Sequence, residues 1–186
     1  MKERLHIISL AGQDAVLAFA DRSERIQTTP LFDRFRRDAL RIRPRLITLD
    51  TAADVFVGNE NSRAQTRAFI NILRGLAIQT GDAAVALASH PSLTGISTGS
   101  GLSGNTAWHN SVRARMYLKA FSESENDDSA LRVLECKKSN YGPISERIVL
   151  RWRNGVFVPE PSTGSLEKAA ADRDVEDISA GAKIPQ

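Results

Sequence analysis

The sequence predicts an α/β protein whose sheet is largely parallel. Apolar segments of strand length at residues 45–50 and 83–90 alternate with segments of helical periodicity at 28–40 and 61–81. An order of strand, helix, strand, helix and strand is typical of an α/β fold. Further strand-like segments then follow with turn signals between them, which predicts that the late strands are partly antiparallel.

The first half of the pattern begins with a short strand expected at residues 5–10. A helix over 28–40 follows, with Thr29 as a candidate N-cap and Pro30 in the first helical position. Residues 45–50 are apolar nearly throughout. A strand of this kind is expected where both faces of the sheet are covered.

The segment 61–81 carries the strongest helical pattern in the chain. Its apolar residues recur at helical spacing and define one face: Phe69, Ile72, Leu73, Leu76 and Ala77. Gly81 supplies a stop signal. The strand predicted at 83–90 then ends at a polar residue, His90.

The second half of the pattern is richer in turns. Residues 91–105 are rich in Gly, Ser and Thr and are predicted to form a flexible loop, and 106–113 are predicted to be helical. Three strands in a meander are expected at 115–121, 131–138 and 147–153. From Pro159 the sequence is polar without a packing pattern, so we expect one domain over 1–158 and a disordered tail over 159–186.

Composition excludes several classes of protein. With 186 residues and 41% hydrophobic residues, the chain can build a core and is neither fibrous nor mainly disordered. The net charge of +3 is compatible with an ordinary surface or with a polyanionic partner. The single cysteine, Cys136, precludes an intrachain disulfide, favours a reducing cytoplasm and lies in a strand-like run typical of a core residue. No apolar stretch approaches the roughly 18 residues of a membrane span.

Polar residues stand at or just beyond the ends of the predicted strands. They are Asp50, His90 and Lys138. Each alone admits a structural role, as a helix cap, a structural histidine or a solvated lysine. Because ligands of open α/β sheets bind outside the carboxyl ends of the strands, their repeated placement predicts a site.

Three blocks of sequence carry a family resemblance. They are "RPRLITLDTAADVFVGNENSRAQTRAFINILRGLAIQTGDAAVALASHPS", "GSGLSGNTAWHNSVRARMYL" and "KKSNYGPISERIVLRWRNGVF". In this order they resemble the second half of a RecA-like AAA-family ATPase, of the RepA-type hexameric replicative helicases of plasmids and phages. The resemblance covers residues 5–158. It implies a partial RecA-like P-loop NTPase sheet with flanking helices, ATP and Mg²⁺ as cofactors, single-stranded DNA as a partner and a hexameric ring.

The resemblance also implies roles for single residues. Asp50 matches the Walker B aspartate, which holds Mg²⁺ usually through water, and His90 matches the sensor of the γ-phosphate. Arg113 matches the arginine finger, which reaches the nucleotide of a neighbouring subunit. Lys138 occupies the first position of a Lys-x-Arg pair, in which Asn140 replaces the arginine. Arg113 would then supply the missing cation.

The loop at 91–105 matches the DNA-binding loop that faces the channel of the ring. It contains no lysine, arginine or aromatic residue. Contacts with DNA would therefore come from backbone amides and hydroxyl groups, with Ser97, Thr98 and Ser100 as the candidates. Such contacts bind phosphate oxygens without reading bases.

The phosphate loop of this family, G-x-x-x-x-G-K-[ST], has no counterpart in the chain. No Gly-Lys pair occurs in the 186 residues. In the family this loop, its strand and the glutamate that polarises water precede the segment that matches residue 5. We therefore expect a C-terminal part of the ATPase domain that lacks the phosphate-loop strand, needs its N-terminal half and is inactive alone.

Two other functions remain open. A non-catalytic nucleic-acid-binding or ring-assembly subunit would use six basic residues, which otherwise form a solvated helix face: Arg34, Arg36, Arg37, Arg41, Arg43 and Arg45. An unrelated α/β enzyme with an Asp50–His90 site would also need a nucleophile turn such as G-x-S-x-G. Residues 95–99, Gly-Ile-Ser-Thr-Gly, imitate that turn only loosely and lack a preceding strand.

Overall fold

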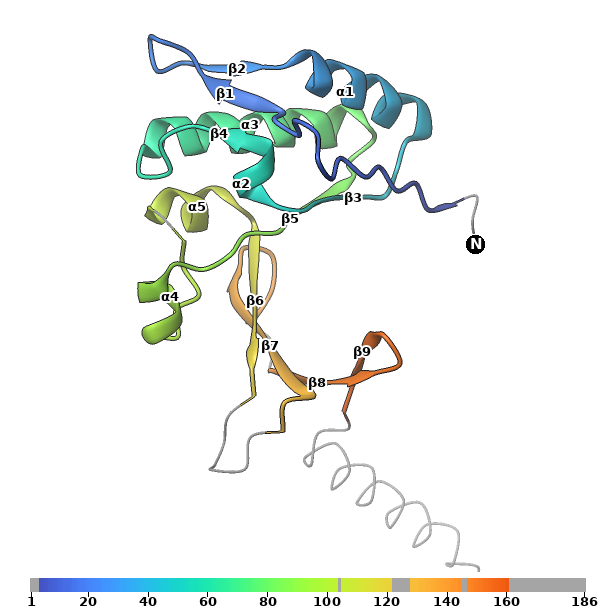
Figure 1. Ribbon diagram of the computed structural model, residues 1–186, viewed down its shortest axis with the longest axis vertical. Coiled ribbons are helices and arrows are strands. Elements are labelled where there is room, and N and C mark those ends of the chain that lie inside the picture. The colour runs from blue at the N-terminus through green and yellow to red at the C-terminus, as the bar shows by residue number, and fades with distance from the viewer. Residues whose placement is uncertain (1–3, 104, 122–127, 145–146, 161–186) are drawn as a thin grey trace, which may run out of the picture. The chain divides into compact units, whose positions relative to one another are not determined.

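The computed structural model describes residues 4–103, 105–121, 128–144 and 147–160 (Figure 1). The chain divides into two compact units, of which the first ends at Val112 and the second begins at Arg113. The sequence predicted a single domain over 1–158, whereas the contacts fall into these two groups. The mixed α/β architecture agrees with the predicted α/β class. The single, largely parallel sheet is wrong, because the described strands form three sheets in which only β1–β4 and β3–β5 pair in parallel.

The first unit contains two small sheets. One has the order β2-β1-β4, in which β1 is antiparallel to β2 and parallel to β4. The other is the parallel pair β3 and β5, which confirms the strands predicted at 45–50 and 83–90. The bounds are β1 Ala18–Ala20, β2 Ile26–Thr28, β3 Leu46–Leu49, β4 Phe56–Val57 and β5 Ala84–Leu87.

The helices of the first unit begin and end at the signals found in the sequence. Thr29 caps α1 by accepting a hydrogen bond from the Phe32 amide (3.2 Å), and Pro30 opens the helix as predicted. The predicted helix at 61–81 is α3, which is followed by Gly81 at a φ of 93°. The bounds are α1 Pro30–Ile42, α2 Ala52–Val55, α3 Arg63–Gln79, α4 Leu93–Ser97 and α5 Thr106–Ser111. Within the described part of the chain, no helix is both long and apolar enough to cross a membrane.

The core of the first unit joins the helices to both sheets. Phe69 of α3 is fully buried and stacks on Phe56 with ring centroids 4.6 Å apart. The same cluster contains Leu73 and Leu76 of α3 and Ile47 of β3. The predicted apolar face of α3 therefore anchors the strand that leads to Asp50.

Two expectations about the early strands are wrong. Residues 5–10 form no strand, and Leu5, Ile7 and Ile8 are 67%, 80% and 63% exposed. An apolar pattern makes a strand only where a ladder partner is available, and here β3 pairs with β5. Strand β3 is also covered on one face rather than two, because Ile47 and Leu49 are buried whereas Leu46 is 59% exposed.

The second unit is an antiparallel meander of the strands β6, β7, β8 and β9 in this order (Figure 1). Its bounds are β6 Ala114–Ala120, β7 Leu131–Ser139, β8 Ile148–Arg153 and β9 Val156–Pro159. The three predicted late strands are confirmed, while β9 was not predicted. Its signal was the Asn154-Gly155 pair, whose φ angles of 49° and 87° give the two-residue turn that this dipeptide favours. The late strands form a sheet of their own instead of joining β5.

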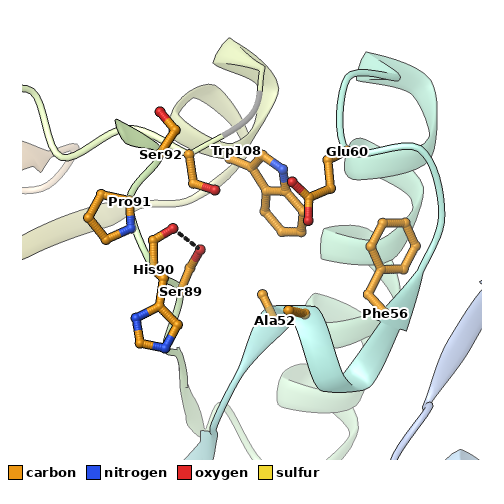
Figure 2. Close-up of a pocket in the computed structure, with 10 residues that line it drawn as sticks. Ala52, Phe56, Glu60, Ser89, His90, Pro91, Ser92 and Trp108 are labelled. Carbon is orange, nitrogen blue, oxygen red and sulfur yellow. Dashed lines mark hydrogen bonds between the residues drawn. The ribbon is translucent and has the colours of Figure 1, made fainter. Parts of the chain in front are cut away.

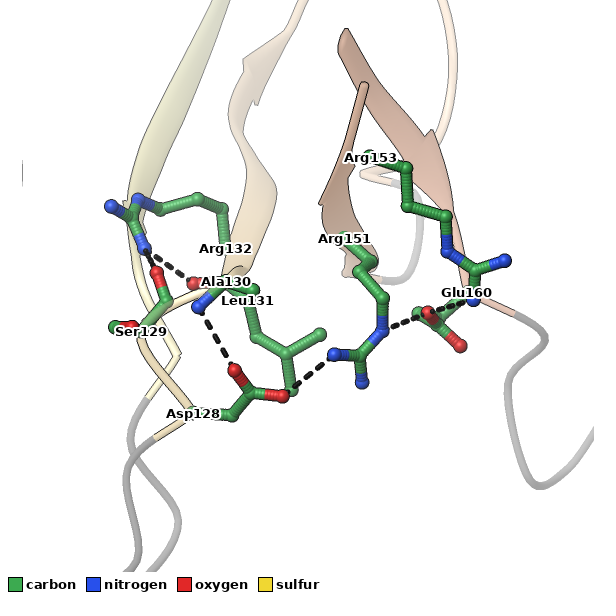
Figure 3. A network of polar contacts seen from close by, with 8 residues as sticks. All are labelled: Asp128, Ser129, Ala130, Leu131, Arg132, Arg151, Arg153 and Glu160. Carbon is green, nitrogen blue, oxygen red and sulfur yellow. Dashed lines mark hydrogen bonds and ion pairs between the residues drawn. The ribbon is translucent and has the colours of Figure 1, made fainter. Parts of the chain in front are cut away.

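The C-terminal boundary lies further along than predicted. Pro159 belongs to β9, and the Glu160 amide donates to the Val149 carbonyl (2.8 Å), so the ordered sheet includes both residues. The Glu160 carboxylate binds the guanidinium groups of Arg151 and Arg153, the latter at 2.9 Å (Figure 3). The predicted disorder of the tail concerns residues 161–186, which lie outside the described residues.

Candidate functional site

Asp50 and His90 come to the same end of the β3–β5 pair. Leu49 lies opposite Leu87 in the parallel register, Asp50 directly follows β3, and His90 lies three residues beyond β5. The Ala88 amide donates to the Leu49 carbonyl (2.9 Å), which continues the pairing past the end of the ladder. Both polar residues are exposed. The placement at a carboxyl edge therefore agrees with the geometry expected from the sequence.

The turn after Asp50 leads directly into α2. The Asp50–Thr51 peptide bond is cis. The Asp54 carboxylate accepts hydrogen bonds from the hydroxyl (2.8 Å) and the amide (3.1 Å) of Thr51. These bonds hold the pKa of Asp54 below its ordinary value, and the charge of His90 adds to the effect. Asp54 is thus engaged at the N-terminus of α2, and Asp50 is the other carboxylate of this turn.

A pocket of about 260 Å³ lies beside this edge (Figure 2). It is lined by Ala52, Ala53, Phe56, Glu60, Ser89, His90, Pro91, Ser92, Ser103 and Trp108. Figure 2 shows the His90 imidazole pointing away from Trp108 and Glu60. The Ser89 hydroxyl donates to the His90 carbonyl (3.4 Å). The lining of the pocket thus includes residues of α2, of the segment that follows β5 and of α5.

Sequence reasoning missed Trp108, which lines this pocket, and Asn105, which binds the carbonyl of the lining residue Glu60. The Trp108 ring lies edge-on to Phe56 and Phe69, at centroid distances of 6.1 and 6.3 Å. The Asn105 side-chain amide donates to the Glu60 carbonyl and to the Thr66 hydroxyl (3.2 Å). Asn105 also caps α5, and an asparagine directly before a helical pattern was the signal that could have revealed it.

Residues 91–103 have more regular structure than the flexible loop that was predicted for 91–105. It contains α4, whose N-terminus is capped by the Ser92 hydroxyl (3.0 Å to the Gly95 amide). The Ser92 amide donates to the Leu102 carbonyl and the Gly101 amide to the Gly95 carbonyl, both at 2.9 Å. A Cβ atom at Gly95 would collide with the Leu102 carbonyl. Composition alone gave the wrong prediction because a serine cap and cross-segment hydrogen bonds order this glycine-rich stretch.

The three candidate DNA contacts of this segment are engaged locally. The hydroxyl groups of Ser97 (3.2 Å) and Thr98 (2.7 Å) donate to the Thr94 carbonyl. The hydroxyl groups of Thr98 and Ser100 are hydrogen-bonded to each other (3.0 Å). A phosphate would have to compete with these bonds, and DNA contact by Ser97, Thr98 and Ser100 stays a prediction. Ser97 also lies within α4 rather than on a strand-to-helix turn, which disfavours a nucleophile there.

The other predicted site residues gather at one end of β6 and β7 in the second unit. Arg113 precedes β6, and its carbonyl accepts a hydrogen bond from the Asn140 amide (3.0 Å). Lys138 lies opposite Arg115 in the antiparallel register. The Arg113 guanidinium carbon is 5.9 Å from the centroid of the Tyr141 ring. The structure therefore brings Arg113, Lys138 and Asn140 together, as it brings Asp50 and His90 together in the first unit.

The arginines around α1 behave mainly as a solvated surface. Arg36 is half-buried and donates to the Gln79 side chain (3.3 Å), and Arg41 pairs with Asp38 (3.2 Å). The remaining members of the set are exposed: Arg34, Arg37, Arg43 and Arg45. An open basic surface is compatible with a polyanionic ligand but does not select one.

The donor set at Asp50 suits a partly hydrated magnesium ion. Among the described residues, no three His, Cys, Asp or Glu side chains group in a way that could hold a metal. Magnesium commonly binds through one or two carboxylates together with substrate phosphates and water, so a single carboxylate at a sheet edge fits it. Cys136 is half-buried and its thiol donates to the Lys138 carbonyl (3.3 Å), which agrees with a structural role.

The fold and the edge of β3 and β5 define an α/β protein that presents polar residues at the carboxyl ends of parallel strands. The family model described as the AAA domain matches residues 1–96, slightly more than half of the chain, and the chain belongs to this family of ATPases. No curated protein matches the chain.

Proposed function

We propose that this chain is part of an ATP-driven helicase of the RepA type, which acts on single-stranded DNA in plasmid or phage replication as a hexameric ring. The observation that supports this function best is the placement of Asp50 and His90 at the same end of the β3–β5 pair. Membership of the AAA domain family supports nucleotide binding at this edge.

In this function several residues of the chain would have separate roles in phosphoryl transfer. Asp50 would hold Mg²⁺ through water, and the ion would neutralise charge on the phosphates. His90 would contact the γ-phosphate from the end of the neighbouring strand. Arg113 and Lys138 would approach the nucleotide of an adjacent subunit, where such an arginine contributes on the order of 10³–10⁵ in rate. Asn140 cannot replace a cation, so Arg113 carries more of this role.

The phosphate loop must come from a polypeptide segment outside these 186 residues, since they contain no Gly-Lys pair. We therefore expect that the chain alone, with Mg²⁺, ATP and single-stranded DNA, does not approach a turnover of about 1 s⁻¹. Steady-state phosphate release measures this. Turnover near that rate that disappears in Asp50→Ala would contradict the need for a separate loop.

The decisive experiment adds a polypeptide that carries the phosphate loop. Turnover should appear and should be lost in Asp50→Asn and in Arg113→Ala. Asp82→Asn is the matched control, because it removes the same charge at a residue that tolerates its left-handed φ of 60° as asparagine. Mixing Arg113→Ala subunits with subunits that have a defective phosphate loop should restore part of the activity. If exchanging subunits show no restoration, the trans assignment of Arg113 fails.

A non-catalytic nucleic-acid-binding or ring-assembly subunit is the second candidate, favoured by the exposed arginines of α1. Replacing Arg34, Arg37 and Arg41 with glutamine should then weaken binding to single-stranded DNA. It should also reduce the salt dependence, by about 0.7 in the log–log slope for each lost phosphate contact. An unchanged slope would show that this surface is solvated and does not bind DNA.

A further inference from the structure

The pocket beside the β3–β5 pair contains a carboxylate but no permanently positive side chain. Of the residues that line it, Glu60 is acidic, His90 is titratable and the others are uncharged. None of these lining residues is a lysine or an arginine. The space of about 260 Å³ therefore lacks the cations that usually bind phosphate, although it lies next to the edge proposed for a nucleotide. Its charge suits a positively charged ligand instead.

The turn that carries Glu60 is held in place by its neighbours. The Asn59 amide donates to the Gln65 side chain (2.8 Å), and the Ser62 amide donates to the Asn59 carbonyl (2.9 Å). Gln65 itself is buried, with 5% of its surface exposed. The Asn105 side chain, at the cap of α5, binds the Glu60 carbonyl. The backbone at Glu60 is thus fixed on both sides, while its side chain is exposed.

The Glu60 carboxylate has no counter-ion within the described residues. No lysine or arginine side chain of these ranges forms a salt bridge with it, and Arg63, which follows in α3, is exposed. Two glutamates of the second unit differ in this respect. Glu135 binds two lysines, and Glu160 binds two arginines. Glu60 therefore keeps a negative charge that is available to a cation from outside the chain.

The aromatic side of the pocket favours an organic cation. Trp108 is half-buried, and its ring lies edge-on to Phe56 and Phe69 at centroid distances of 6.1 and 6.3 Å, which hold it in place. Figure 2 shows the Glu60 side chain turned toward this ring. A cation is attracted to the face of an aromatic ring, most strongly to that of tryptophan. A carboxylate and an indole in one pocket thus attract the same kind of ligand.

We propose that this pocket binds an alkylammonium or guanidinium group, with Glu60 as its counter-ion and Trp108 as its aromatic contact. Such a group combines positive charge with an apolar stem, which matches a lining of mixed polar and apolar residues. Two sources contain it: a free polyamine, and a lysine or arginine side chain in a basic segment of another protein. The inference goes beyond the proposed function and does not depend on it, because the ligand contains no phosphate.

The first test compares three small probes on the full chain at constant ionic strength: ethylguanidinium, its neutral analogue ethylurea, and inorganic phosphate. Ethylguanidinium should bind, whereas ethylurea and phosphate should not. Glu60→Gln should weaken the binding of ethylguanidinium by roughly 5-fold, the upper range for an exposed ion pair. Glu24→Gln is the matched control, because it removes the same charge from an exposed turn of the same unit, and it should keep wild-type affinity.

Several results of this comparison would overturn the site. They are equal binding of ethylguanidinium and ethylurea, no binding of ethylguanidinium, and unchanged affinity in Glu60→Gln. Because Glu60 is exposed and its side chain makes no ion pair in the described ranges, Glu60→Gln should fold like the wild type. Thermal unfolding of the two proteins checks this.

A second measurement tests the aromatic contact. In a Trp152→Phe background, Trp108 is the remaining tryptophan, and its ring current should move the ethyl proton resonances of bound ethylguanidinium upfield. Trp108→Leu should abolish this shift and weaken binding by roughly 2- to 30-fold. If Trp108→Leu does not fold, the Trp152→Phe protein alone decides, since the absence of an upfield shift in a bound ligand would overturn the contact with Trp108.

Spermidine and the peptide acetyl-Gly-Arg-Gly-amide separate the two sources of the cation. Tighter binding of spermidine that is lost in Glu60→Gln assigns the pocket to a free polyamine. Tighter binding of the peptide with the same dependence assigns it to a basic segment of another protein. Binding of both that is insensitive to Glu60→Gln would overturn the proposal. None of these probes contains a nucleotide, so the results leave the proposed ATPase function to its own experiments.

Discussion

The first unit buries Phe69, Leu73 and Leu76 of one helix in a shared core, whereas the second unit has one buried hydrophobic residue among those described, Val133 at 2% exposure. In the second unit, backbone ladders and ion pairs take the place of a deep core. Most ion pairs near a surface contribute little free energy and are screened by salt. The comparison teaches that the edge with Asp50 is supported by a packed core, whereas the end of β6 and β7 with Arg113 belongs to a sheet held mainly by backbone ladders and by ion pairs of small individual contribution.

The ion pairs of the second unit form two groups. In one, Glu135 binds Lys119 and Lys137. In the other, Arg151 binds Asp128 (2.6 Å) and Glu160 (Figure 3). Two carboxylates around Arg151 hold its pKa above the ordinary value, first through the hydrogen bond to Asp128. These contacts connect β8 to the turn before β7 and to the end of β9.

The largest expected effect is the loss of the first unit's core. Phe69→Ala removes a fully buried ring and should lower the free energy of unfolding of this unit by about 3–5 kcal/mol. Chemical denaturation followed by Trp108 fluorescence in a Trp152→Phe background measures it. In the second unit, Leu118→Ala removes a side chain that is 46% exposed and should cost far less. Equal losses in the free energy of unfolding for Phe69→Ala and Leu118→Ala would show that the two units do not differ in core packing.

The next effect tests the close packing of α4. Gly95→Ala places a methyl group against the Leu102 carbonyl and should cost roughly 1–3 kcal/mol, as overpacking usually does. Proteolysis between residues 91 and 102 should become faster, because the hydrogen bonds that close this segment would be strained. Unchanged stability and proteolysis would mean that the segment adjusts freely, in conflict with the ordered loop described above.

A smaller effect tests the ion pairs of the second unit. Hydrogen bonds from Lys119 and then Lys137 hold the pKa of Glu135 below the ordinary value of 4.5. Because the folded pKa is depressed, its stabilisation is present above pH 4.5 and is lost as the pH falls through the lower, folded pKa. Glu135→Gln should cost roughly 1 kcal/mol at neutral pH and remove this part of the acid sensitivity.

Trp152 fluorescence in a Trp108→Phe background reports the unfolding of the second unit. Glu24→Gln removes the same charge from an exposed turn of the first unit. This change should alter neither the stability of the second unit nor the pH dependence of that stability. An acid sensitivity that persists in Glu135→Gln would place its origin in other carboxylates.

The smallest expected effect is a gain in stability rather than a loss. Gly75 lies inside α3 and has no atom within 4 Å of the position where a Cβ would be built. Gly75→Ala should therefore stabilise the first unit by about 0.5–1 kcal/mol through its helix propensity. Thermal unfolding detects this gain, and a loss of stability would contradict the open space beside Gly75.

Local signals in the sequence predicted much of the fold. The cap at Thr29, the apolar face of α3 and the strands around Ile47 and Val85 depend on neighbours in the chain, so pattern and propensity find them. The strand expected at residues 5–10 failed because an apolar run does not reveal whether a ladder partner exists. Strand β9 was missed although Asn154-Gly155 is a strong hairpin signal.

The site was predictable to a different degree. Asp50 and His90 could be placed at one edge because parallel strands share their carboxyl ends. The contacts around the pocket could not be predicted, since Asn105 and Trp108 contact residues of α3 and of the segment before it that lie far away in sequence. Tyr141 gave no signal either, because only the pairing of β6 with β7 brings it to Arg113.

The parallel pairing of β3 with β5 has a consequence for the order of events during synthesis. Leu46 pairs with Ala84, 38 positions later, whereas Arg153 pairs with Val156 across a two-residue turn. Distant pairings form more slowly than hairpins. At 5–20 residues per second, a ribosome needs roughly 2–8 s to produce β5 after β3. During that interval Ile47 and Leu49 have no partner strand, and the apolar face that they form is open to other chains.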